Sequence, residues 1–96
     1  MATFVVLAKW TEKSFEAMKD PAAWEEVKKY VKDMGVEIKG WYMLMGQYDE
    51  ICILESPDAE TVAKIVITLM AKYGGKSETL RAFSEEEAKK LCPSHR

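Results

Sequence analysis

The chain has 96 residues, of which 48% are hydrophobic and 31% charged, and this composition excludes disordered and fibrous proteins. Its 14 basic residues are interleaved with 16 acidic ones, and the net charge is -2. Because the basic residues form no stripe, nucleic acid is not an expected partner. The length fits one domain, which we expect over residues 1–91, followed by a loose tail over residues 92–96.

The compartment is indicated by the N-terminus and by the cysteines. The first apolar run stops at Lys9, which makes it too short for a signal peptide or a membrane span. Cys52 and Cys92 are too few for the disulfide framework of a small secreted domain. We therefore expect a cytoplasmic protein with reduced thiols and no membrane association.

The first part of the chain predicts a strand followed by a helix. Residues 3–10 are a run of β-branched and apolar residues with the length of a strand. A short helix over residues 11–19 is an option before Asp20 and Pro21, which predict the cap and the first turn of a longer helix. That longer helix covers residues 21–34, where the apolar positions follow helical spacing.

The middle of the chain predicts a β-hairpin and a second long helix. Residues 36–45 and 50–55 have the composition of strands. They are joined by residues 46–49, a short connection that begins with glycine, where a positive φ is easiest. Ser56 and Pro57 then predict the cap and the first turn of the helix that follows.

The last part of the chain completes the fold. Residues 77–83 predict a fourth strand, and Ser84 with Glu87 forms a capping box that opens a short helix ending at Leu91. The order strand, helix, strand, strand, helix, strand is that of the α+β ferredoxin-like βαββαβ fold. Right-handed crossovers place both long helices on one face of a four-stranded antiparallel sheet.

The strands carry apolar residues on both faces, although the helices cover only one. With regular alternation, four large side chains face away from the helices and together expose about 400 Å², near the limit that monomers tolerate. They are Trp10, Trp41, Met43 and Met45. We expect a second copy to cover this face, sheet against sheet, giving a homodimer or a higher oligomer of dimers. The alternative is that the helix ending at Leu91 folds back over it.

Residues 46–49 read Gly-Gln-Tyr-Asp, and this element resembles the motif for which the GYD domain family is named. Residues 3–13 and 78–84 also resemble that family, so the likeness covers nearly the whole chain. The resemblance implies a dimeric α+β barrel, in which ferredoxin-like units pair through their sheets. It implies no established activity.

The candidate site residues are aromatic and charged side chains near the hairpin. Asp49 beside Tyr48 would bind an amine or move a proton if the pair were buried, and both are candidates for catalysis; turn capping and ring packing are the structural alternatives. Trp10 and Trp41 are candidates to line an apolar pocket, with packing as the alternative. Arg81 would hold an anionic ligand near that pocket, unless it extends to the rim.

Three functions fit these residues. The first is a homo-oligomer that binds a small molecule in a pocket at or near the sheet-sheet dimer. The second, implied by relatives of the dimeric α+β barrel, is a cofactor-independent enzyme of the monooxygenase or isomerase type, with Asp49 or Tyr48 as proton acceptor or donor. The third is a stand-alone amino-acid effector module, since the ligand domain of leucine-responsive regulators is similar. No cofactor or metal site is expected, because the chain has one histidine and no phosphate-binding glycine motif.

Overall fold

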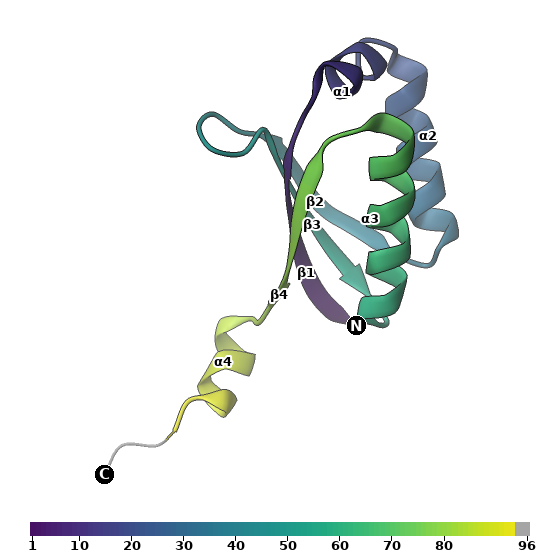
Figure 1. Ribbon diagram of the computed structural model, residues 1–96. Helices are drawn as coiled ribbons and strands as arrows, with labels where there is room; N and C mark the ends of the chain where they lie inside the picture. Colours follow the sequence, from purple (N-terminus) through teal and green to yellow (C-terminus); the bar gives the residue numbers. More distant parts are fainter. Residues whose placement is uncertain (94–96) are drawn as a thin grey trace.

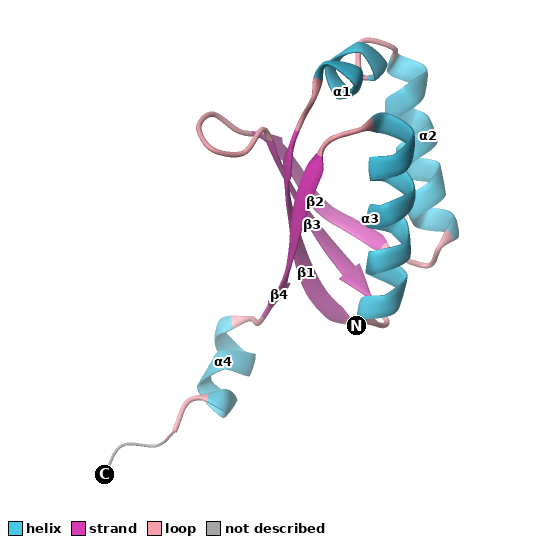
Figure 2. Ribbon diagram, in the orientation of Figure 1, coloured by secondary structure: helices cyan, strands magenta, loops and turns pink. Residues whose placement is uncertain are grey.

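A four-stranded antiparallel sheet with the strand order β2-β3-β1-β4 forms one layer of the computed structural model, which describes residues 1–93. Helices α2 and α3 form the second layer and both lie on the same face of the sheet (Figures 1 and 2). The elements in chain order are β1 (Ala2–Lys9), α1 (Glu12–Ala17), α2 (Pro21–Asp33), β2 (Glu37–Met43), β3 (Glu50–Ser56), α3 (Ala59–Tyr73), β4 (Lys76–Ala82) and α4 (Glu85–Leu91). The predicted α+β ferredoxin-like arrangement is confirmed, and the optional helix before Asp20 is present as α1. Of the predicted tail, residues 94–96 lie outside the described residues.

The helix starts follow local capping chemistry. The Asp20 side chain accepts a hydrogen bond from the Ala22 backbone N–H at 2.9 Å, with Pro21 in the first turn, as predicted. The predicted cap of α3 is wrong, because Asp58 and not Ser56 caps it, accepting from the Thr61 backbone N–H at 2.8 Å. Ser56 remains the last residue of β3 and is fully buried. The bonds from Thr61 lower the pKa of Asp58, since they favour its charged form.

The core lies between the sheet and the two long helices. Its buried residues come from both layers and form one cluster: Phe4, Val6, Val31, Val36, Leu54, Val62 and Ile65. Among residues 1–93, no helix is long and apolar enough to cross a membrane.

An irregularity in β2 changes which side chains face the helices. The pairing with β3 shifts register between Ile38 and Gly40, so that Ile38 lies opposite Leu54 and Trp41 lies opposite Cys52. Because Lys39 is an extra residue, Ile38 and Trp41 point to the same face, the one covered by the helices. The regular alternation assumed for this strand is therefore wrong.

The face away from the helices differs from the expected one, at Trp41 because of the irregularity in β2 and at Trp10 because this residue alternates with Phe4, Val6 and Ala8 on the helix side. Trp10 and Trp41 lie on the helix side and do not contribute to it, while Met43 and Met45 are exposed near the hairpin. The strand register places a different set of apolar residues on the uncovered side of the sheet. We call this side the open face, and its apolar residues are Val5, Leu7, Tyr42, Ile51, Ile53 and Leu80. Tyr42 is 60% exposed and Leu80 44%. The open face thus carries an apolar cluster, as predicted, but the cluster is built from other residues, and Glu55 and Glu78 lie on the same side of the sheet.

Helix α4 extends beyond the end of β4 and away from the sheet (Figure 1). It buries none of its residues, and Leu91 is 64% exposed. The predicted capping box is confirmed, with the Glu87 backbone N–H donating to Ser84 Oγ and the Ser84 backbone N–H donating to Glu87 Oε1. The alternative in which this helix covers the open face is not what the structure adopts, since α4 offers little apolar area to bury.

Candidate functional site

A cavity of about 850 Å³ lies between the sheet and helices α2 and α3. Its walls are mostly apolar and come from β1, β2, β3, α1, α2, α3 and the segments that follow β1, α1, α2 and α3. The three tryptophans of the chain all line it: Trp10, Trp24 and Trp41. The volume lies within the range of about 300 to 1,000 Å³ that is usual for small-molecule sites.

The tryptophans form one aromatic cluster. The ring centroids of Trp24 and Trp41 are 4.7 Å apart with the planes at 83°, and those of Trp10 and Trp41 are 6.5 Å apart. Trp10 also packs edge-on against Phe15 of α1 at 5.0 Å. The Trp24 indole donates to the Met18 carbonyl oxygen at 2.9 Å, which fixes this ring against the loop before α2.

Glu50 places a carboxylate in the cavity wall. Glu50 is the first residue of β3 and is half-buried. One carboxylate oxygen accepts the Trp10 indole N–H at 2.6 Å, and the other accepts the Trp41 indole N–H at 2.7 Å. Hydrogen bonds to an ionised acceptor are stronger than neutral ones, so this pair of bonds holds the two rings and the carboxylate in a fixed arrangement.

Cys52 lies on the same face of β3, two residues beyond Glu50. Burial raises the pKa of Cys52 to about 12, and the negative charge of Glu50 adds to the effect. The thiol is therefore neutral at physiological pH, and a neutral thiol is a poor nucleophile.

Asp49 stabilises the end of the hairpin. Its carboxylate accepts the Trp10 backbone N–H at 2.7 Å, and its own backbone N–H donates to the Ala8 carbonyl oxygen at 2.8 Å. The Tyr48 ring lies 5.8 Å from the Lys9 ammonium. Neither Tyr48 nor Asp49 lines the cavity.

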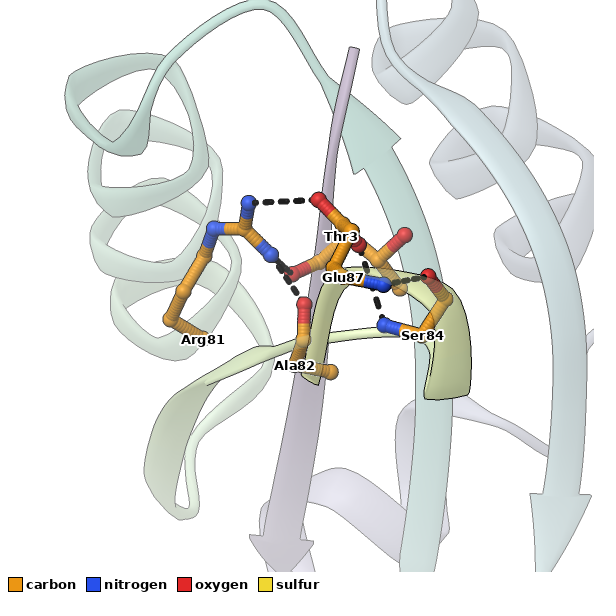
Figure 3. Close-up of polar contacts among 5 residues, drawn as sticks. All are labelled: Thr3, Arg81, Ala82, Ser84 and Glu87. Carbon is orange, nitrogen blue, oxygen red and sulfur yellow. Dashed lines mark hydrogen bonds and ion pairs between the residues drawn. The ribbon is translucent and has the colours of Figure 1, made fainter. Parts of the chain in front are cut away.

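Arg81 lies away from the cavity, at the junction of β4 and α4 (Figure 3). Its guanidinium donates to the carbonyl oxygens of Thr3 and Ala82 and lies 3.6 Å from the Glu87 carboxylate. It also lies over the Phe83 ring, 4.3 Å from the centroid. The structure thus brings Trp10 and Trp41 together in the cavity wall, and Asp49 contacts the backbone of Trp10 from outside the cavity. Arg81 lies apart from these residues.

Sequence reasoning missed two residues of this site. The sequence pattern presents Glu50 only as the first residue of a strand, and Trp24 only as part of a buried helix stripe. The available signal for Glu50 was a carboxylate directly before the apolar residues 51–54 of β3. Glu50 faces the helices through the regular pairing of β3 with β1, whereas the orientation of Trp41 depends on the irregular register of β2, which the sequence pattern did not reveal.

The different environments of Cys52 and Cys92 predict that a disulfide reagent such as DTNB labels them at different rates at pH 8. A pKa of about 12 in place of 9.0 reduces the thiolate fraction of Cys52 on the order of 1,000-fold. We expect the folded Cys92→Ser variant to react only when it unfolds, whereas Cys52→Ser reacts at once through the exposed Cys92. Rapid labelling of folded Cys92→Ser would contradict the neutral thiol.

Two comparisons with solved structures agree with this fold. The crystal structure of FFRP-DM1 superposes with a TM-score of 0.56 at 21% identity, covering 86% of this chain and 100% of that one. The crystal structure of TTHA0845 from Thermus thermophilus gives a TM-score of 0.54 at 20% identity, covering 88% and 95%. At these identities the likeness concerns the fold alone.

The sequence comparisons extend over the same region. A protein of Thermus thermophilus, named glutamine synthetase and cystathionine beta-lyase binding protein, is 34% identical over 84 residues. The match covers 85% of this chain and 88% of that protein. The model of the GYD domain matches residues 4–92. Because this match takes in both layers of the fold and the cavity between them, the chain belongs to the GYD domain family.

Proposed function

We propose that this protein is a homo-oligomer that binds a small molecule in the cavity between its sheet and its helices, without catalysing a reaction on it. The cavity of about 850 Å³, lined by three tryptophans and containing a fixed carboxylate, is the observation that carries this proposal. An apolar space with few, well-held polar groups is typical of ligand sites. The cavity belongs to a single protomer, so the ligand does not need the partner's sheet.

Oligomerisation is supported by the open face. Six apolar side chains from all four strands lie on it, and none of the helices among residues 1–93 covers them. Burial of apolar area stabilises association by about 25 cal/mol per Å² before the costs of association. A second copy related by a two-fold axis presents the same apolar residues to this face and so matches it in chemistry.

The absence of catalysis is inferred from the state of the reactive groups. Asp49 and Tyr48 do not line the cavity, and the Asp49 carboxylate holds the Trp10 backbone N–H at the end of the hairpin. Cys52 is a neutral thiol because its pKa is raised. The enzyme and the amino-acid effector module stay as predictions, because no contact in the described part of the chain specifically favours them.

A neutral apolar dye tests the cavity directly. N-phenyl-1-naphthylamine should bind saturably and accept energy from the tryptophans, because all three line the cavity. Val27→Phe, which fills part of the cavity, should weaken this binding about tenfold or more. Ala63→Phe adds a ring on an exposed position of α3 and serves as the matched control. Binding that is absent, or equal in both variants, would contradict a ligand site here.

Sedimentation equilibrium at micromolar concentration tests the oligomer. We expect at least twice the chain mass of 11.0 kDa. Leu80→Glu puts a charge on the open face and should raise the dissociation constant at least tenfold, because a buried unpaired carboxylate is costly. Ile67→Glu, at an exposed position of α3, should leave the mass unchanged. A wild-type chain that sediments as a monomer would overturn the sheet pairing.

A second candidate function is binding to a metabolic enzyme. It is favoured by the relative named as a glutamine synthetase and cystathionine beta-lyase binding protein, which matches most of this chain at 34% identity. The immobilised chain should then retain one of these two enzymes from its own organism at micromolar concentration, and should not retain an unrelated enzyme of similar charge. Failure to retain either would contradict this function.

A further inference from the structure

Among residues 1–93, Glu50 is the one charged side chain of the cavity wall that is withdrawn from solvent. Four charged residues line the cavity, and three of them, Lys28, Lys32 and Glu37, are exposed. Glu50 is half-buried among the tryptophans. The inner part of the cavity therefore carries a single negative charge in apolar surroundings.

The protein fixes this carboxylate without neutralising its charge. The two groups that bind Glu50 are indole N–H donors, which are uncharged. Among residues 1–93, no lysine or arginine forms an ion pair with Glu50. Each carboxylate oxygen has a second lone pair, so both can still accept a bond from a ligand. A half-buried charge without a counter-charge is unfavourable, and a bound cation would offset that cost.

The aromatic rings offer a second attraction for a cation. Ring faces attract an ammonium group, and tryptophan does so most strongly. Within the described part of the chain, the stacked cations lie over other rings, those of Phe4, Tyr48, Tyr73 and Phe83. None of these cations therefore lies over a cavity tryptophan, and the rings contact only one another and Phe15 among the aromatic residues of residues 1–93.

We propose that the cavity binds an apolar organic ammonium, with its charged nitrogen at Glu50 and its hydrocarbon body among the tryptophans. The proposal names the ligand class for the proposed binding function and rests on it. A single carboxylate is a poor site for a metal ion, which requires several ligands. An anionic ligand would be repelled, and a neutral one would leave the charge of Glu50 uncompensated.

Intrinsic fluorescence of the full chain tests this assignment at pH 7 with three probes that share a six-carbon body: hexylamine, 1-hexanol and hexanoate. We expect hexylamine, which is protonated at this pH, to bind at least tenfold more tightly than 1-hexanol, and hexanoate to bind most weakly. Glu50→Gln keeps the side-chain volume and should remove the preference for the amine while 1-hexanol still binds. Glu86→Gln removes one exposed charge from α4 and should leave the preference intact.

The possible results distinguish the proposal that the ligand is an ammonium compound from the proposal that the cavity binds small molecules. Equal affinity for hexylamine and 1-hexanol in the wild-type chain would overturn the ammonium proposal and leave the cavity as a binding site. A preference for the amine that persists in Glu50→Gln would also overturn it. No binding of any probe would count against the cavity itself. If circular dichroism shows that Glu50→Gln is unfolded, the order of the three probes in the wild-type chain decides the proposal.

Discussion

The two hydrogen bonds from the Trp10 and Trp41 indoles to Glu50 connect three strands at one end of the fold. Trp10 follows β1, Trp41 belongs to β2, and Glu50 opens β3. The rings and the carboxylate must all face the helices for these bonds to form, and for Trp41 this requires the extra residue in β2. The place of Trp41 in the aromatic wall and its bond to Glu50 are therefore consequences of one local change in strand register.

Two neighbouring acidic residues of the hairpin, Asp49 and Glu50, hold Trp10 through different hydrogen bonds. Asp49 binds its backbone N–H and Glu50 binds its indole N–H, so the main chain and the side chain of one residue are fixed from the same turn. Because side chains alternate along a strand, only Glu50 faces the cavity, while Asp49 is committed to the main chain. This division explains how a turn motif identified from the sequence lies beside the candidate site without lining it.

The parts of the structure that depend on local chemistry were predictable from the sequence. Asp20 with Pro21 and Ser84 with Glu87 determine helix starts through bonds within a few residues, and these starts were correct. Ser56 and Asp58 were both chemically suitable caps, and only the length of β3 decided between them. The site depends on contacts across 9 and 40 residues and on an extra residue in β2, and periodicity alone does not encode such features.

The direction of α4 has a consequence for how the molecule moves through a solvent. Helix α4 follows β4 just after Arg81 and points away from the sheet and the two long helices. The protomer therefore measures 55 × 31 × 18 Å. So elongated a particle experiences more friction than a sphere of the same mass. Its elution volume in size-exclusion chromatography, taken alone, would therefore overestimate the number of subunits in the assembly.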